Sequence, residues 1–380
     1  MTTAQSPFPT VAKLAKECGA TWACYEQVAQ QTAKAEEILR AVLLAAAGGE
    51  RLLDPDSSLV LCGSFARREM VTGSDCDWTL LINGVVNNHH GEVARLISNA
   101  IVMAEKENKG LKSPGTTGTF GNLTFSHDLV HRIGGIADTN ENLTRRMLML
   151  LESRPVSFSA ADSSEQIWKA VLRCILERYF EEDVHFGKKK VPRFLVNDLT
   201  RYWRTICVDY AAKYHEQAGR KWAVRNAKLR FSRKLLFASG LAFCFGCRLN
   251  PPNKVQKDLF GETEDKTSAP FIDSAMGFAA TPPLEYLAAF VDAFVVGAEK
   301  RKKVSEHIFG AYNEWLRILG DDEKRKALES LTHENAGSDA TFQEIRKISA
   351  SFSKGLKLLF FNREQDDDKI ADLSLEYVGF

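Results

Sequence analysis

The stretch GSFARREMVTGSDCDW, residues 63–78, connects the apolar run SLVLC at 58–62 to a second apolar run that continues as TLLIN at 79–83. Each run has the length and composition of a buried β-strand. A connection this short indicates that the two strands lie side by side in one sheet. We therefore expect residues 58–62 and 77–83 to form neighbouring strands, with the polar stretch at one end of the pair.

Two aspartates, Asp75 and Asp77, stand where the second strand is expected to begin. Residues i and i+2 of a strand point to the same face, so the two carboxylates converge. Carboxylates held close together repel unless they are protonated or bridged by a cation. Oxygen ligands favour Mg²⁺ or Mn²⁺, and Mg²⁺ commonly lies between carboxylates and substrate phosphates. The pair therefore predicts a site for Mg²⁺ or Mn²⁺.

Gly63 and Ser64 supply groups that suit a phosphate. A glycine at the end of a strand lets the backbone approach a phosphate closely, and the serine hydroxyl and the following N–H groups can donate to phosphate oxygens. Arg67 and Arg68 can balance the charge of a triphosphate. With metals on the aspartates, the stretch predicts a site where an acceptor oxygen attacks a nucleoside triphosphate. One metal would activate the acceptor oxygen, and the other would hold the triphosphate. The alternative is a surface turn capped by the aspartates.

The same stretch resembles the motif of the polymerase-β-type nucleotidyltransferase superfamily, and within it the bacterial protein-uridylyltransferase-like group. The residues that carry the resemblance are Gly63, Phe65, Ala66, Arg67, Glu69, Ser74, Asp75 and Asp77. It covers about residues 55–155, and LLESR at 150–154 resembles that group's helix after the sheet. It implies metal binding by Asp75 and Asp77 and nucleotide contacts from Gly63, Ser64, Arg67 and Ser74, with Glu69 orienting Arg67 or capping the turn.

The chain departs from this pattern at one position. The superfamily usually supplies a third carboxylate from a later strand, which aligns near Thr119, but no acid lies between Lys109 and Ser126. The candidates further along are Asp128, Asp138 and Glu152. Three alternatives stay open: an acid from elsewhere, a site that needs only two carboxylates, or a site that binds nucleotide without turnover.

The 380 residues predict two domains, and 44% hydrophobic with 26% charged residues is typical of a globular protein. The net charge of +1 provides no overall field for nucleic acid or membrane, so any basic site is local. Helices are expected at 25–48 and 90–109, and residues 138–140 are expected to cap a helix through Glu152. Strand signals end near residue 155, and the helical segments expected beyond it are 164–184, 194–216, 222–246, 284–300, 302–319, 322–332 and 340–360. We predict an α+β fold: a nucleotidyltransferase domain over 1–155, with a small mixed sheet flanked by helices, and an all-helical domain over 156–380.

Neither a signal peptide nor a membrane span is expected, because the N-terminal segment lacks an apolar run and the longest apolar stretches are too short. This favours a cytoplasmic protein whose eight cysteines are reduced. The basic stretch at 219–235 is either a wall that holds triphosphate or RNA, or a solvated helix face. His89 and His90 are expected in a loop after the second strand.

The predicted function is metal-dependent transfer of a nucleoside monophosphate from an NTP to a protein, RNA or small-molecule acceptor, with release of pyrophosphate. The first alternative is a catalytically impaired, nucleotide-binding regulatory or toxin–antitoxin-type protein, which the missing third carboxylate favours. The second is a synthase of cyclic or oligomeric nucleotides. The sequence does not select the base, the acceptor or the oligomeric state.

Overall fold

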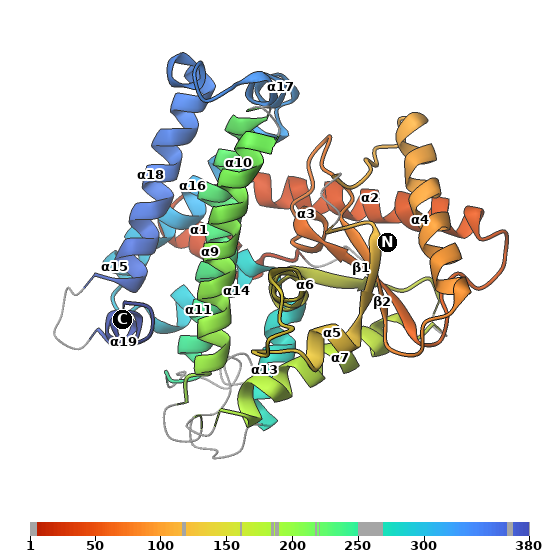
Figure 1. Ribbon diagram of the computed structural model, residues 1–380. Coiled ribbons are helices and arrows are strands. Elements are labelled where there is room, and N and C mark those ends of the chain that lie inside the picture. Colours follow the sequence, from red (N-terminus) through yellow and green to blue (C-terminus); the bar gives the residue numbers. More distant parts are fainter. Residues whose placement is uncertain are drawn as a thin grey trace. The chain divides into compact units, whose positions relative to one another are not determined.

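The computed structural model describes residues 6–115, 119–159, 162–183, 186, 190–216, 219, 221–249, 269–362 and 368–379. The chain forms two compact units (Figure 1). The sheet unit comprises Val28–Glu182 and Ala275–Pro282, and the helical unit comprises Met1–Gln27, Asp183–Ser274 and Pro283–Phe380. These units are not consecutive in sequence, because the first 27 residues group with the C-terminal half. The division into domains 1–155 and 156–380 stays a prediction.

The sheet has four strands in the order β3-β2-β1-β4 and is mixed, so the mixed α/β character expected from the sequence is confirmed. The central strands β1 (Ser57–Cys62) and β2 (Trp78–Ile82) are antiparallel neighbours, with Leu61 opposite Trp78. The edge strand β3 (Asn122–Phe125) runs parallel to β2. The other edge strand, β4 (Ser153–Val156), pairs antiparallel with β1 and was not expected from the sequence.

Strand β4 escapes sequence reasoning because it is four residues long and contains Pro155. Proline cannot donate to a β-ladder and is confined to sheet edges, which is where β4 lies. The segment LLESR therefore contains the end of one helix and the start of a strand, not a helix throughout.

The two faces of the sheet have different cover. Alternate strand residues such as Leu59, Leu61, Trp78 and Leu80 form one buried cluster with residues of two long helices. These helices are α2 (Cys24–Ala46) and α4 (Asn88–Lys106), which match the helices expected near 25–48 and 90–109. On the other face, α7 (Ser164–Glu181) packs against β1 and β4 (Figure 1).

Three short helices complete the sheet unit: α3 (Gly63–Ala66), α5 (Ser126–Val130) and α6 (Asn140–Leu151). Helix α3 follows β1 directly and begins the polar connection to β2. Thr139 caps α6, since its side chain accepts from the backbone N–H of Asn142. The N-capping at 138–140 expected from the sequence is thereby confirmed.

The helical unit contains α1, which the sequence reasoning did not identify, and helices close to the segments expected between 194 and 360. The described elements are α1 (Pro9–Cys18), α9 (Arg193–Glu216), α10 (Trp222–Lys228), the π-helix η1 (Leu229–Arg233), α11 (Lys234–Gly246), α14 (Pro283–Phe294), α15 (Ala298–Ser305), the π-helix η2 (Glu306–Gly310), α16 (Ala311–Gly320), α17 (Asp322–Ser330), the 3₁₀-helix η3 (Ala336–Ser338), α18 (Ala340–Phe360) and α19 (Lys369–Tyr377). Helix α13 (Ala269–Ala280) contributes to both units. Every helix in the described part of the chain is too short or too polar to cross a lipid bilayer.

Candidate functional site

Asp75 and Asp77 lie in the segment that leads into β2. Asp77 directly precedes the first residue of the strand. Both are half-buried, whereas Cys76 between them is fully buried and belongs to the cluster formed with α2 and α4. Because side chains alternate along extended backbone, the two carboxylates point away from that cluster. The convergence of the Asp75 and Asp77 carboxylates on one site stays a prediction.

Gly63 brings the two halves of the motif together. The backbone N–H of Cys62 donates to the Asp77 carbonyl at 2.8 Å, which extends the β1–β2 pairing to the end of β1. Gly63 follows with φ of +65°, and a Cβ placed on it would stand 2.8 Å from Asp77 Oδ2. Glycine suits this position, since a larger residue would have a strained backbone and would have to displace the carboxylate. The turn at Gly63 and Ser64 therefore lies directly against Asp77.

Asp75 has a cationic neighbour that sequence reasoning did not identify. Lys112 Nζ lies 3.3 Å from Asp75 Oδ1, and both side chains are about one-third exposed, at 36% and 34%. The carbonyl of Lys112 also accepts from the Cys76 N–H at 2.8 Å, which fixes the lysine backbone beside the aspartates. Lys112 therefore relieves part of the repulsion between the two carboxylates in the absence of a metal.

Arg67 is buried between two acids. Its Nε donates to Glu69 Oε2 at 2.8 Å and its Nη1 donates to Glu152 Oε2, and all three residues are at most 7% exposed. This pairing compensates the guanidinium charge within the fold and ties the turn after β1 to the start of β4. Glu69 does orient Arg67, one of its two suggested roles. A phosphate contact from Arg67 stays a prediction.

The two serines of the motif have different settings. Ser74 closes a tight turn, because its Oγ accepts from the Val71 N–H at 3.1 Å and its own N–H donates to the Val71 carbonyl at 2.9 Å. Ser64 is half-buried in the first turn of α3, beside Gly63. Ser64, unlike Ser74, directly follows Gly63, the residue that lies against Asp77.

Each candidate for the third carboxylate has a basic partner. Asp128 of α5 pairs at 3.0 Å with Arg132, which follows this helix, and Glu152 pairs with Arg67. Asp138 is 7% exposed and accepts two bonds from the buried Arg146, at 3.1 and 3.0 Å. The buried pairs of Asp138 and Glu152 give these two acids roles in holding the fold, whereas Asp128 forms a surface ion pair.

A small pocket lies against the sheet, at the end of β1 and along β2 and β3. It is lined by Cys62, Thr79, Thr119, Phe120, Thr124, Arg145, Leu148 and Met149. The hydroxyls of Thr79 and Thr124 are hydrogen-bonded at 2.7 Å across β2 and β3. Thr119, near which the resemblance expects the third acid, lines this pocket, and no acidic residue is among its lining residues.

The thiols around the site are poor nucleophiles. Burial raises the pKa of Cys62 well above its ordinary value, and the negative charges of Glu152 and Asp77 raise it further. Burial also raises the pKa of Cys76, with Asp77 and Asp75 acting in the same direction. Because thiolates are the reactive form, neither cysteine is poised for covalent chemistry.

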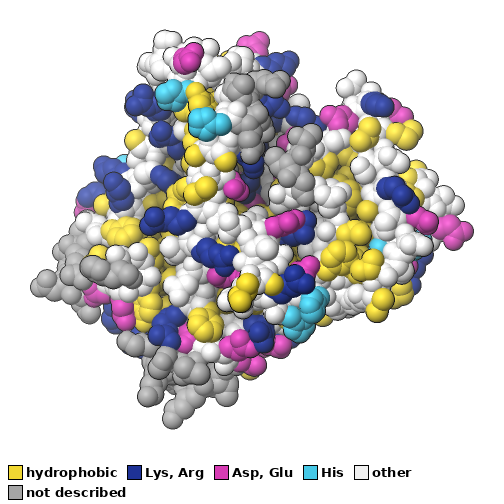
Figure 2. Space-filling model, viewed as in Figure 1, with side chains coloured by type: hydrophobic (Ala, Val, Ile, Leu, Met, Phe, Trp, Pro, Cys, Tyr) yellow, Lys and Arg dark blue, Asp and Glu magenta, His cyan; other side chains and the backbone are white. Residues whose placement is uncertain are grey.

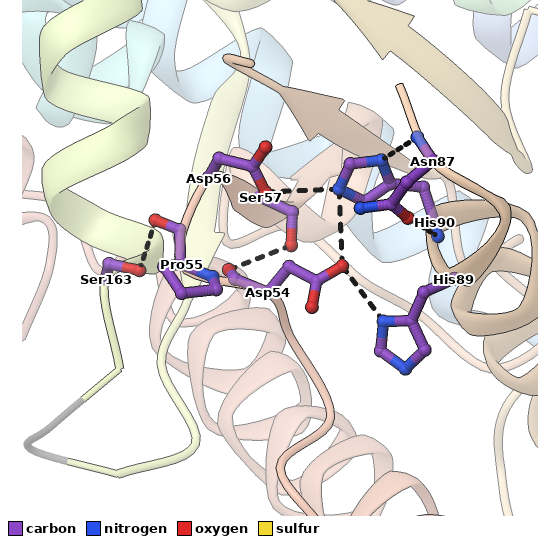
Figure 3. A network of polar contacts seen from close by, with 8 residues as sticks. All are labelled: Asp54, Pro55, Asp56, Ser57, Asn87, His89, His90 and Ser163. Atoms are coloured by element: carbon purple, nitrogen blue, oxygen red, sulfur yellow. Dashed lines mark hydrogen bonds and ion pairs between the residues drawn. The ribbon is translucent and has the colours of Figure 1, made fainter. Parts of the chain in front are cut away.

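A second polar cluster lies at the opposite end of β1, where Asp54 and Asp56 precede the strand (Figure 3). His90 Nε2 lies 3.1 Å from Asp56 Oδ1 and 3.3 Å from Asp54 Oδ2. Among the described residues, Asp54, Asp56 and His90 form a group whose possible ligand atoms lie close enough together to share one metal ion. His90 is fully buried in the first turn of α4, which agrees with the helix expected from 90 to 109, whereas the loop expected for His89 and His90 was wrong.

The capping of α4 accounts for this cluster without a metal. Asn87 Oδ1 accepts from the His90 N–H at 3.1 Å, and His90 Nδ1 accepts from the Asn87 N–H at 3.3 Å (Figure 3). Since Nδ1 is an acceptor, the neutral ring carries its proton on Nε2. That proton is donated to the aspartates, and the lone pair that a metal would need on Nε2 is absent.

Comparison of the chain with protein-family models, with curated proteins and with solved structures found no match. Assignment to the nucleotidyltransferase superfamily therefore stays a prediction from the motif.

Proposed function

We propose that the chain is a metal-dependent nucleotidyltransferase that moves a nucleoside monophosphate from an NTP to an acceptor and releases pyrophosphate. The observation that carries the proposal is the approach of Gly63 to the Asp77 carboxylate, where a Cβ would stand 2.8 Å from Oδ2. It sets a backbone turn suited to phosphate beside a carboxylate suited to Mg²⁺. A surface turn with capping aspartates would not require this contact.

The donor set fits Mg²⁺ or Mn²⁺. Two half-buried carboxylates from alternate residues offer oxygen ligands, and Mg²⁺ is often bound by one or two carboxylates with substrate phosphates completing its shell. When bound, the ion would neutralise phosphate charge and polarise the phosphorus that is attacked. Lys112 at 3.3 Å from Asp75 is a surface ion pair, and such pairs are weak enough for an ion to displace.

The residues of the chain supply binding and orientation. The Ser64 hydroxyl and the first N–H groups of α3 would donate to triphosphate oxygens, and Gly63 lets the phosphate reach them. The buried Arg67–Glu69–Glu152 group holds this turn in place. Arg67 and Ser74 would act on the nucleotide chiefly through the shape of the turn.

A protein, RNA or small molecule stays open as the acceptor, and a cytoplasmic location goes with this proposal. The second candidate function is a nucleotide-binding regulatory protein without turnover. It is favoured by the pocket in which Thr79, Thr119 and Thr124 stand without an acid among the lining residues. A synthase of cyclic or oligomeric nucleotides would use the same residues without an added acceptor.

The test is incubation of the pure protein with each α-labelled NTP and Mg²⁺ or Mn²⁺, with and without cell RNA and protein extract. Label in a macromolecule or in a new small nucleotide is expected with the wild type and not with Asp75→Asn/Asp77→Asn. The matched control is Asp54→Asn/Asp56→Asn, which alters the pair at the other end of β1 and should keep transfer. Metal-dependent NTP binding without any product would favour the regulatory function. Full activity in the Asp75→Asn/Asp77→Asn protein would refute both the metal-dependent transfer at these aspartates and the regulatory function.

A further inference from the structure

Two rows of polar side chains face each other within the helical unit. The first row has a residue every four positions across α10, η1 and α11: Asn226, Arg230 and Lys234. The second row follows one face of α18 at spacings of three or four residues: Arg346, Ser349, Ser353 and Lys357. Arg230 Nη1 donates to Ser349 Oγ at 3.4 Å, and Lys234 Nζ donates to Ser353 Oγ at 2.8 Å. We call these two rows the basic seam.

The basic seam has cations without acids. Arg230, Lys234, Arg346 and Lys357 form no salt bridge among the described residues, and the members that join the rows are neutral serines. The pKa of Lys234 is lowered by burial and by the nearby charges of Arg230 and Lys357. Figure 2 shows Lys and Arg side chains over the area where Figure 1 draws α18. An anion bound here would relieve this repulsion.

An aromatic pocket adjoins one end of the basic seam. Its lining includes Asn226 and Arg230 of the first row and Arg346 of the second, and the cavity measures about 440 Å³. Its aromatic lining residues are Trp222, His333 and Phe342. The ring centroids of Trp222 and His333 are 5.0 Å apart, and those of Trp222 and Phe342 are 5.2 Å apart. No acidic residue lines the pocket.

Arg230 is held in position by neutral groups. Its Nε donates to Asn226 Oδ1 at 2.6 Å, and Asn226 Nδ2 donates to the Tyr210 hydroxyl at 2.9 Å. The guanidinium is thereby oriented without being neutralised. Arg230 also lies in the π-helix η1, and π-helical turns are frequent at functional sites because they displace side chains from the regular helical positions.

We propose that the pocket and the basic seam together bind a nucleotide chain, with a base against the aromatic residues and consecutive phosphates along the cations. Four residues of helix advance roughly 6 Å, which is close to the distance between neighbouring phosphates of an extended strand. A flat aromatic base next to a row of negative charges is offered by a nucleoside triphosphate and by the end of a single-stranded RNA. Aromatic surfaces beside a cationic track are the usual means of binding single strands. This site lies within the helical unit and goes beyond the transfer reaction proposed for Asp75 and Asp77.

The test measures binding of a fluorescent single-stranded pentaribonucleotide to the full chain by anisotropy, with ATP and inorganic triphosphate as competitors. Arg230→Ala and Arg346→Ala are each expected to weaken binding about tenfold and to reduce the salt dependence of log K by about one unit for each cation removed. Arg346 is exposed, so its loss leaves the packing unchanged. The matched control is Lys347→Ala, an exposed neighbour outside the basic seam, which should keep wild-type affinity.

The competitors identify the source of the nucleotide. Displacement by ATP at concentrations below those of inorganic triphosphate shows that the base contributes, and His333→Ala should remove that difference. If the pentanucleotide binds and ATP does not compete, the ligand is RNA. If ATP alone binds, the ligand is a nucleoside triphosphate. Equal weakening by Lys347→Ala and Arg346→Ala would overturn the proposal, as would equal competition by ATP and inorganic triphosphate. Binding should persist in Asp75→Asn/Asp77→Asn, so loss of transfer and loss of this site are separate results.

Discussion

At the scale of single residues, the site depends on contacts that join distant positions. Gly63 accommodates the Asp77 carboxylate, and Arg67 is enclosed by Glu69 and Glu152. The residues in both contacts are buried or half-buried. We therefore expect a point mutation at either Gly63 or Arg67 to have a measurable effect.

Gly63→Ala should abolish transfer and lower the free energy of unfolding. The left-handed backbone costs about 1–2 kcal/mol for a residue with a Cβ, and the new methyl would displace the Asp77 carboxylate. Gly110→Ala is the matched control, because Gly110 has φ of +80° and no atom within 4 Å of its Cβ position. Urea unfolding and the labelling assay distinguish the two effects. Equal activity of the two variants would show that the contact with Asp77 is unimportant.

Arg67→Met should destabilise the sheet unit, because it leaves Glu69 and Glu152 buried without their cation. Loss of one partner of a buried ion pair typically costs about 3–5 kcal/mol. The comparison is Arg132→Met, which breaks the exposed pair with Asp128 and should change stability by less than about 1 kcal/mol. Urea denaturation measures both. A stable Arg67→Met protein with weakened NTP binding would instead support the phosphate contact predicted from the motif.

At the scale of elements, the junction of η1 with α11 concentrates positive charge. Lys234 opens α11 directly after the π-helix, and burial, Arg230 and Lys357 all lower its pKa. A sequence-based helical pattern continues through this junction and does not reveal the π-helix, because the wider turn arises from the packing of the unit.

Lys234 should make stability depend on pH in the alkaline range. The unfolded lysine has a pKa near 10.5, whereas the folded pKa is lower, so the folded state binds fewer protons between the two values. The free energy of unfolding should therefore rise with pH between the folded and unfolded pKa values. Below this range Lys234 is charged in both states, and the stability that its charge costs the folded protein is lost in full. Lys234→Met should remove this rise, and Lys347→Met should retain it. Urea midpoints measured from neutral pH to about pH 11 test the sign; a rise retained in Lys234→Met would assign it to another group.

At the scale of the whole molecule, the N-terminal segment folds with the C-terminal half. Leu14 of α1 is fully buried, and α1 packs against α14 and α15. The Glu285 carboxylate of α14 accepts from the Thr10 and Val11 N–H groups at 2.8 and 3.2 Å, at the start of α1. These contacts satisfy N–H groups that a helix start leaves unpaired.

Leu14→Ala should therefore weaken the helical unit. A buried Leu→Ala change costs about 2–5 kcal/mol, and hydrogen exchange is expected to accelerate in α14 and α15 while β1 and β2 keep their protection. Leu59→Ala, in the core of the sheet unit, is the reciprocal control and should accelerate exchange in β1 and β2. Faster exchange in the strands and not in α14 after Leu14→Ala would contradict the grouping of the N-terminus with the helical unit.

Local patterns in the amino-acid sequence predict much of the sheet unit. The strands expected at 58–62 and 77–83 and the helices expected at 25–48 and 90–109 follow from periodicity and turn chemistry over a few residues. The motif also predicts that Gly63 and Asp77 belong to one site. These features depend on neighbours in sequence, whose geometry is nearly independent of the rest of the chain.

Only the tertiary structure shows which distant residues meet. Arg67 contacts Glu152 across 85 positions, Glu285 caps α1 across 275 positions, and β4 joins the sheet despite its proline. The rows of the basic seam likewise come from segments 119 positions apart. No local pattern encodes these pairings, because each depends on how burial brings whole elements together after their own geometry is set.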